Sequence, residues 1–423
     1  MVRWAWAGAL ALVLLVPVQA GAARRMEVAL SDDAVFLDQA YYQRDRGFEQ
    51  ARALGVTRMR VVLTWSTVLG DQAKRTTPPE HPEYYLGRYD RLIDRAAAAG
   101  IRVQLILTGP APAFATADRR SGVNHPDARL FGDFARAVAA HFKGRVDRYS
   151  VWNEANYKAW LAPLGESPTI YRALYLAGYS AIKSVDRHAA VLIGETAPFA
   201  LRGRSLAPLD FLRRAACVTR RYKTDKTCAR ALPAPGGALR ADGYAHHPYD
   251  FLHPPDYRYK GRDNVTIGTL GRLTAALDRL RAARALIGPR RRPLALYLTE
   301  FGYFQAGRRR ISESRQAKYL PRAFAIAQRN PRVREMLQYG LVVPPSDQPG
   351  AYFQLGIVAL DGTPRKPFQT LQSWSRSAMR KRRVARPGGP IALPPARPSP
   401  DPPHPPPPSE EPPPLLPPLP PLP

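Results

Sequence analysis

Short apolar stretches alternate with amphipathic segments along most of this chain. The apolar stretches are rich in Val, Ile and Leu, and they show little alternation between apolar and polar positions. Such stretches are typical of parallel strands that are buried on both faces. The pattern predicts eight strands, at Glu27–Leu30, Val56–Leu63, Arg102–Leu107, Asp147–Trp152, Val191–Gly194, Asp242–His246, Ala295–Thr299 and Met336–Val342.

The segments between these strands have the apolar spacing of helices that bury one face. Gly55 and Gly100 stand just before a predicted strand, where a glycine commonly ends a helix. Examples of the predicted helices are Asp45–Leu54, Tyr89–Ala99, Ala128–Phe142, Thr169–Val185, Leu270–Ala285 and Ser314–Gln328.

This alternation over residues 26–379 predicts an α/β protein, a (β/α)8 TIM barrel. A doubly wound open sheet is the alternative. The first strand-to-helix turn speaks against it, because that turn lacks the glycine-rich sequence that binds phosphate in such sheets.

The N-terminal segment differs from this domain. Arg3, the apolar run from Trp4 to Val18 and the small residues Ala20-Gly21-Ala22 predict that residues 1–22 are a secretory signal peptide. An uncleaved anchor is the alternative. With the peptide removed, no apolar run is long enough for a stable membrane span, so the sequence predicts a secreted or cell-envelope protein.

The C-terminal segment, residues 380–423, also stands apart. It begins with the basic cluster Arg380-Lys-Arg-Arg383, and from Pro387 onward it holds nearly half of the 45 prolines. This composition predicts a disordered or polyproline-like tail, for which a contact with the cell envelope is one interpretation.

Composition also indicates the cellular compartment of the protein and the class of ligand that it binds. Cys217 and Cys228 are the only cysteines, and in an exported protein they predict a disulfide that closes a loop. No histidine pair has ligand spacing, so we expect no metal site and no cofactor. The net charge of +29 is compatible with an anionic partner, but the arginines are scattered and no nucleic-acid recognition module is visible. We therefore expect a basic solvated surface and no nucleic-acid partner, with an acidic glycan as the second interpretation.

Two predicted strands, the fourth and the seventh, end in a glutamate. The stretches are Tyr149-Ser-Val-Trp-Asn-Glu154 and Leu296-Tyr-Leu-Thr-Glu300. Active sites of these barrels lie at the carboxyl ends of the strands, so both side chains fall on the same face. One protonated and one ionised carboxyl group form the arrangement that cleaves glycosidic bonds. Taken singly, each glutamate is equally compatible with a surface position at a strand end.

Residues 26–375 resemble the retaining glycoside hydrolases of clan A, in particular families 5 and 39. The resemblance is strongest at Val151-Trp-Asn-Glu-Ala-Asn156 and Leu298-Thr-Glu-Phe-Gly302. It implies that Glu154 is the general acid/base, that Glu300 is the nucleophile, and that Asn153 binds the sugar 2-hydroxyl. The resemblance also implies a monomeric enzyme that hydrolyses O-glycosidic bonds of a β-linked oligo- or polysaccharide.

The match has two departures. Ala155 stands where many relatives have proline, and the eighth strand lacks their tryptophan, so its stacking role is absent or falls to Tyr339. The departures leave the catalytic pair in place but bear on which sugar is bound.

Further candidates surround the two glutamates. Arg60 lies within an apolar run, where an unpaired charge is costly, so we expect it to pair with Glu300 and keep that carboxylate ionised. His247 and Tyr249 match the His-x-Tyr that clan members commonly carry after the sixth strand. The resemblance implies that the tyrosine bonds the nucleophile and that the histidine contacts the sugar or Glu154. We interpret His246 as a core residue.

Aromatic and acidic residues near strand ends complete the set. Trp65, Trp160 and Tyr303 are candidate platforms for stacking a sugar, although each also suits the core, and Trp152 should be buried. Glu195, after the fifth strand, should bind a substrate hydroxyl or pair with a basic neighbour.

Two other functions remain open. A glycan-binding or cell-surface protein could use the same barrel without turnover, which the missing tryptophan and the proline-rich tail favour. A basic protein that binds nucleic acid or a membrane surface is the third reading.

Overall fold

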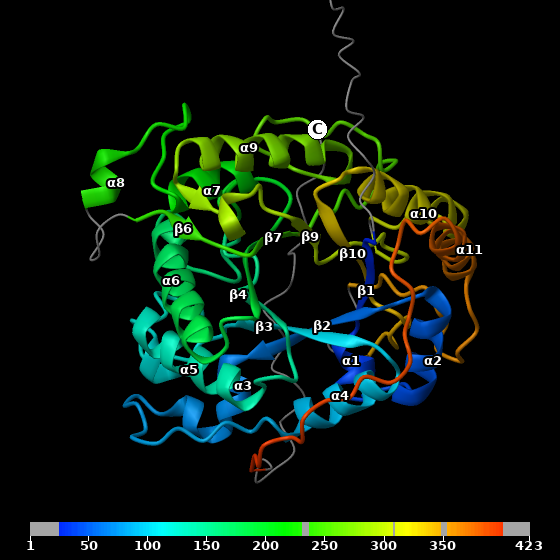
Figure 1. Ribbon diagram of the computed structural model, residues 1–423, viewed down its shortest axis with the longest axis horizontal. Helices are drawn as coiled ribbons and strands as arrows, with labels where there is room; N and C mark the ends of the chain where they lie inside the picture. The colour runs from blue at the N-terminus through cyan, green and yellow to red at the C-terminus, as the bar shows by residue number, and fades with distance from the viewer. Residues whose placement is uncertain (1–24, 231–236, 308, 348–352, 401–423) are drawn as a thin grey trace, which may run out of the picture.

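Eight parallel strands close into a barrel, in the order β1-β10-β9-β7-β5-β4-β3-β2. The computed structural model describes residues 25–230, 237–307, 309–347 and 353–400, and the predicted signal peptide lies outside these ranges. In Figure 1 the strands form an inner ring with the helices around it. The barrel strands are β1 (Glu27–Ser31), β2 (Arg58–Thr64), β3 (Arg102–Thr108), β4 (Arg148–Val151), β5 (Ala190–Thr196), β7 (Gly243–His246), β9 (Leu296–Leu298) and β10 (Val333–Tyr339).

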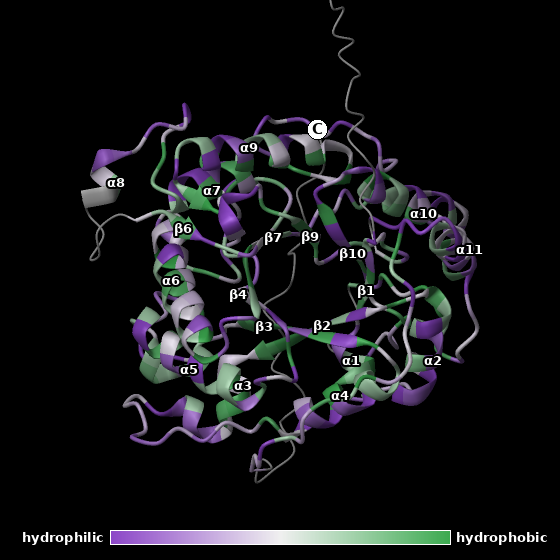
Figure 2. Cartoon of the chain, in the orientation of Figure 1, coloured by the Kyte–Doolittle hydropathy of each residue, from purple (hydrophilic) through white to green (hydrophobic). Residues whose placement is uncertain are grey.

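The helices cover the outside of the barrel, and Figure 2 shows apolar and polar residues alternating around them. In α4 the residues Tyr89, Leu92, Ile93 and Ala96 are buried, one stripe of a helical surface. Within the described residues, no helix has the length and apolarity that a membrane span requires. The helices are α1 (Asp33–Phe36), α2 (Arg44–Leu54), α3 (Trp65–Leu69), α4 (Gly87–Ala98), α5 (Ala128–His141), α6 (Ser167–Val185), α7 (Pro208–Ala215), α8 (Lys226–Arg230), α9 (Leu270–Ala282), α10 (Glu313–Arg329) and α11 (Lys366–Arg380).

The predicted barrel is confirmed, and every predicted strand overlaps an observed one. A separate two-stranded sheet, β6 (Leu239–Arg240) with β8 (Leu286–Ile287), was not predicted. The last barrel strand begins earlier than expected because Glu335 is buried inside the barrel. Its carboxylate lies 2.6 Å from Arg148 Nη1, so a polar residue here does not mark a loop.

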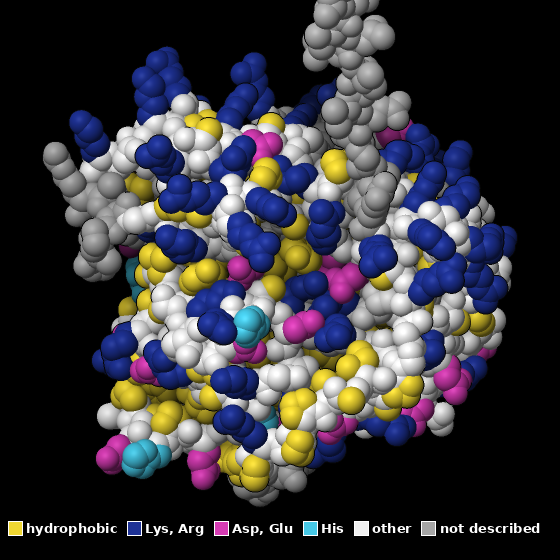
Figure 3. Space-filling view, viewed as in Figure 1, with side chains coloured by type: hydrophobic (Ala, Val, Ile, Leu, Met, Phe, Trp, Pro, Cys, Tyr) yellow, Lys and Arg dark blue, Asp and Glu magenta, His cyan; other side chains and the backbone are white. Residues whose placement is uncertain are grey.

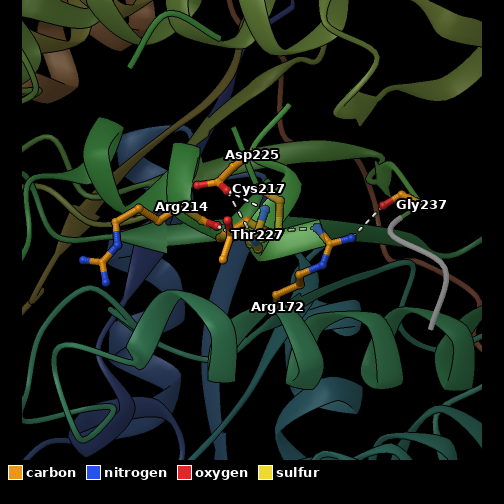
Figure 4. The surroundings of a disulfide bond; sticks show 8 residues. Arg172, Arg214, Cys217, Asp225, Thr227 and Gly237 are labelled. Carbon is orange, nitrogen blue, oxygen red and sulfur yellow. Dashed lines mark hydrogen bonds between the residues drawn. A yellow bond between two sulfur atoms is a disulfide. The ribbon is translucent and has the colours of Figure 1, made fainter. Parts of the chain in front are cut away.

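The predicted disulfide between Cys217 and Cys228 is present, and it ties the turn that follows α7 to α8 (Figure 4). Arg172 of α6 bonds the chain on both sides of this region, at the end of α7 and beyond α8. Its guanidinium donates to Ala215 O at 3.0 Å and to Gly237 O at 2.6 Å.

Residues 381–400 form an extended C-terminal strap on the outside of the barrel. Val384 forms a β-bridge with Met26, next to β1. Farther along, Pro394 O accepts a hydrogen bond of 2.7 Å from the arginine that follows α5, and Ser399 Oγ donates at 3.1 Å to a carbonyl that precedes α4. The strap therefore crosses the outer surface along α4.

Of the two forms predicted for the proline-rich tail, the strap has the extended one, and its docking on the barrel was not predicted. Residues 401–423 of the predicted tail lie outside the described residues. Proline has no N–H to donate, which favoured a tail without packed structure. The strap instead uses its carbonyls as acceptors. Arg145 donates to Pro394 O, and Arg52 donates to Gly388 O at 3.2 Å.

Removing the strap should destabilise the barrel. We expect a chain ending at Arg383 to melt about 1–3 °C below a control chain ending at Pro400, because a loss of about 1 kcal/mol lowers Tm by about 2–4 °C in domains of about 150–250 residues and by less in a larger one. The shorter chain loses the Pro394 and Ser399 bonds and the packing of Leu393 on the core. Thermal scans by circular dichroism measure the difference, and equal melting temperatures would contradict it.

Candidate active site

Glu154 and Glu300 meet at the carboxyl end of the barrel. Glu154 lies three residues beyond β4, and Glu300 lies two residues beyond β9. One carboxylate oxygen of each lies within 4.8 Å of the other. Both side chains are 8% exposed, so they are nearly removed from water yet reachable.

The backbone after β4 is held in an unusual conformation. Trp152 and Glu154 have φ angles of 63° and 35°. Positive φ in a non-glycine residue costs of order 1–3 kcal/mol and is concentrated at functional sites. The indole of Trp152, buried as predicted, donates to Trp160 O at 2.7 Å, and Glu154 N donates to Glu195 O at 2.8 Å. These bonds fix the direction in which Glu154 leaves the strand.

Arg60 of β2 lies inside the barrel and contacts three side chains of the site. Its Nη2 is 3.0 Å from Glu300 Oε1 and 3.4 Å from Glu195 Oε2. The same nitrogen donates to Asn153 Oδ1 at 3.0 Å. Burial lowers the pKa of the guanidinium, but the two glutamates outweigh it and raise that pKa above its usual value. The predicted pair between Arg60 and Glu300 is present.

His247 bridges two carboxylates. Its Nδ1 lies 2.8 Å from Glu154 Oε1, and its Nε2 lies 2.7 Å from Glu195 Oε2. Burial lowers the pKa of His247, yet Glu300, Glu154 and Glu195 together raise it to about 10. The ring is therefore an imidazolium at neutral pH, with both nitrogens acting as donors.

Glu195 is a buried counter-ion of Arg60 and His247. It is fully buried, and Thr299 Oγ1 also donates to it at 2.7 Å. Burial raises its pKa, but Arg60 and His247 lower it to about 2. Of the two predicted roles for Glu195, the pairing with a basic neighbour is the one present.

The two candidate catalytic carboxyls have unlike surroundings. Burial raises the pKa of Glu154, against the lowering effect of its bond to His247. Glu300 faces Arg60 and accepts a hydrogen bond of 3.1 Å from Tyr249 OH, the contact expected of that tyrosine. Different surroundings of this kind separate an acid from an ionised partner.

The same residues form the one cluster within the described ranges that could hold a metal. Glu154, His247 and Glu300 each bring a ligand atom within 4.8 Å of the others. An imidazolium, however, has no lone pair for a metal. The charge on His247 therefore favours a proton-bearing bridge at this position.

Two predicted sugar platforms are corrected. Trp65 is 1% exposed and stacks on a phenylalanine of α5, because it begins α3 on the outside of the barrel. Tyr303 is 1% exposed, and its hydroxyl donates to a backbone carbonyl at 3.3 Å. Trp160 is 6% exposed and packs beside Tyr157. Its backbone carbonyl accepts the hydrogen bond from the indole of Trp152 and so supports that residue.

Two further expectations concern neighbours of the site. His246 is a core residue as predicted, since its ring bonds Thr196 Oγ1 at 2.9 Å and Val265 O at 3.0 Å. Tyr339, the possible replacement for the missing tryptophan, is half-buried and packs edge-on against Phe353.

A narrow pocket with largely apolar walls opens beside the two glutamates. Sequence reasoning missed these walls because they come from loops that carry no motif. The one signal was an aromatic residue a few positions beyond a strand end, as at Phe199 and Phe251. The wall side chains are Tyr157, Phe199, Leu201, Ser205, Phe251 and Phe353.

Basic side chains are spread over the face shown in Figure 3 and do not gather into one patch there. This distribution agrees with the expectation of a solvated basic surface.

No protein-family model and no curated protein sequence matches this chain. Solved structures do match. A family 39 glycoside hydrolase from the gut symbiont Bacteroides cellulosilyticus WH2 has a TM-score of 0.59 at 18% identity, over 83% of this chain and 64% of that one. An exo-β-1,4-mannosidase from Opitutaceae bacterium strain TAV5 has a TM-score of 0.53 at 18% identity, over 87% of this chain and 63% of that one. A family 39 β-xylosidase from Caulobacter crescentus has a TM-score of 0.53 at 16% identity, over 84% of this chain and 72% of that one.

The chain therefore has the (β/α)8 barrel fold that these solved glycoside hydrolases share. The chain spans less than two thirds of the length of the first two structures. The likeness places the carboxyl ends of β4 and β9 on the face where such barrels carry their active sites.

Replacing His247 should change how stability depends on pH. Its pKa is about 10 in the folded protein and 6.5 when unperturbed, so its charge stabilises the fold fully below pH 6.5. That contribution is lost as the pH rises toward 10. We expect Tm to fall more steeply between pH 7 and pH 10 in the native protein than in His247→Gln, as measured by circular dichroism. His188→Gln, at an exposed position, is the control. Equal slopes for the native and His247→Gln proteins would show that the bridge is not charged.

Proposed function

We propose that this protein is an exported glycoside hydrolase that cleaves β-linked O-glycosidic bonds with retention of configuration. The observation that carries the proposal is the closeness of the two carboxylates, whose nearest oxygens lie within 4.8 Å. Retaining enzymes hold the carboxyl groups about 5–5.5 Å apart, whereas inverting enzymes need about 6.5–9.5 Å to admit a water. The short separation supports direct attack by one carboxylate.

In the first step Glu154 gives its proton to the leaving oxygen as the bond from that oxygen to the anomeric carbon breaks. The raised pKa of Glu154 keeps this proton available. Glu300 attacks the anomeric carbon and forms an ester with the sugar, while the leaving group departs as an alcohol. Arg60 and Tyr249 hold Glu300 in position through contacts of 3.0 Å and 3.1 Å.

In the second step a water takes the place of the departed alcohol. Glu154, now a carboxylate, removes a proton from it, and the oxygen attacks the anomeric carbon and releases Glu300. His247 stabilises the ionised form of Glu154 between the steps through its bond to Oε1. Asn153 uses Oδ1 to accept from Arg60, which leaves its Nδ2 to donate to a sugar hydroxyl.

Two further observations support the proposal. The names of the structural neighbours include an exo-β-1,4-mannosidase and a β-xylosidase, which supports a carbohydrate substrate. The sequence of residues 1–22 and the disulfide support export, because disulfides persist in oxidising compartments.

Substitution of the two glutamates tests the reaction. We expect Glu300→Gln to lower kcat/KM for 4-nitrophenyl β-glycosides by at least about a thousandfold, because an amide cannot form the ester intermediate. In Glu154→Ala, azide should restore turnover and yield a β-glycosyl azide, because azide attacks the intermediate without a base. Glu49→Gln, at an exposed position, is the control.

Two results would contradict this proposal. Undiminished turnover in Glu300→Gln would remove the nucleophile. Binding of glycans by the native protein without any turnover would instead support the non-catalytic function on the same barrel.

A further inference from the structure

The pocket beside the two glutamates includes, next to Glu154, the space that a leaving group would occupy. In the reaction proposed above, the leaving oxygen receives its proton from Glu154, so the group attached to that oxygen occupies the adjoining space. The loops after β4 and β5 form this side of the site, and they contribute Tyr157, Phe199 and Leu201 to the pocket. Phe251 closes the pocket from the loop after β7.

The pocket offers few hydrogen-bonding groups. Ser205 Oγ already accepts from a backbone N–H at 2.9 Å and donates to a carbonyl at 2.8 Å. Tyr249 donates to Glu300. The other polar groups among the described lining side chains are the hydroxyl of Tyr157 and the carboxyls of the two glutamates. A second sugar in this space would bury hydroxyls without partners, which is costly for each of them.

The apolar wall is also built firmly. Tyr249 and Phe251 stack with ring centres 4.6 Å apart, and Phe199 stacks on Tyr259 at 5.1 Å. Rings that are fixed before binding lose little entropy when an apolar group packs against them. One cation also lies here. The guanidinium of Arg309 is 5.8 Å from the ring centre of Phe251, and burial lowers its pKa to about 10.

We propose that the substrate is a β-glycoside of an apolar alcohol or phenol, whose alkyl or aryl group fills the pocket formed by Phe199, Leu201 and Phe251. This inference rests on the glycosidase function proposed above, and it specifies the group on the leaving side as a hydrocarbon and not another sugar. Hydrolysis then consumes one water and releases the free sugar and the apolar alcohol.

The test uses the full chain and has two stages. A panel of 4-nitrophenyl β-glycosides of glucose, xylose, mannose, galactose and glucuronic acid first identifies the sugar. The hexyl, methyl and 5-carboxypentyl β-glycosides of that sugar are then compared with its β-1,4-linked disaccharide with glucose. The hexyl and methyl alcohols have similar acidity, so their difference in kcat/KM reports burial of the chain.

We expect kcat/KM for the hexyl glycoside to exceed that of each other compound by at least about tenfold. Phe199→Ser and Phe251→Ser should reduce the ratio of hexyl to methyl turnover at least about fivefold. Leu360→Ser is the control, because that leucine is 45% exposed and does not line the pocket.

The native protein alone can overturn the inference, so a variant that does not fold does not rescue it. A hexyl advantage below tenfold removes the apolar leaving group and leaves the glycosidase function standing. A preference for the carboxypentyl glycoside assigns the pocket to an anion held by Arg309 and also overturns the inference. If no glycoside is turned over and a 2-fluoro glycoside labels no glutamate, the proposed function falls and the inference falls with it.

Discussion

A guanidinium buried inside the barrel determines the geometry of the site. Arg60 is 1% exposed, and an isolated charge at such a position costs several kcal/mol unless it is paired. Its partners Glu195 and Glu300 come from β5 and from the end of β9, so pairing links strands that are not neighbours in the barrel. Because both carboxylates are drawn toward one nitrogen, the position of Glu300 follows from the barrel core and depends little on the loops.

The charges of this cluster also explain why Glu154 suits the role of acid. Arg60 and His247 supply two positive charges, whereas Glu154, Glu195 and Glu300 supply three negative charges when all are ionised. A buried cluster is most stable when its charges balance, so one proton is best retained. Burial disfavours the ionised form of both Glu195 and Glu154, but Arg60 and His247 lower the pKa of Glu195 to about 2, whereas the pKa of Glu154 stays raised. The proposed mechanism accordingly assigns the retained proton to Glu154.

The sequence was informative where a residue violated its local pattern. An arginine within an apolar strand must find a counter-ion, and a glutamate at the end of such a strand must face the barrel mouth, so Arg60 and Glu300 could be paired before the fold was known. The predictions for Trp65 and Tyr303 were wrong because an aromatic residue near a strand end can pack in the core as well as against a sugar. Only the packing of the fold decides between these two positions. The docking of the strap was not predicted, because a high proline content indicates missing N–H donors. It does not indicate which carbonyls accept hydrogen bonds from Arg52 and Arg145.

The net charge of +29 is a poor guide to the substrate for the same electrostatic reason. The cations nearest the reacting atoms, Arg60 and His247, are already matched by buried carboxylates, so they leave no excess positive charge to attract an anion. The exposed arginines act through water and salt, which weaken their effect beyond about 10 Å. Recognition must then come mainly from contact, and the contact surface beside Glu154 is made of Phe199, Leu201 and Phe251. The proposed apolar leaving group is therefore compatible with a strongly basic protein.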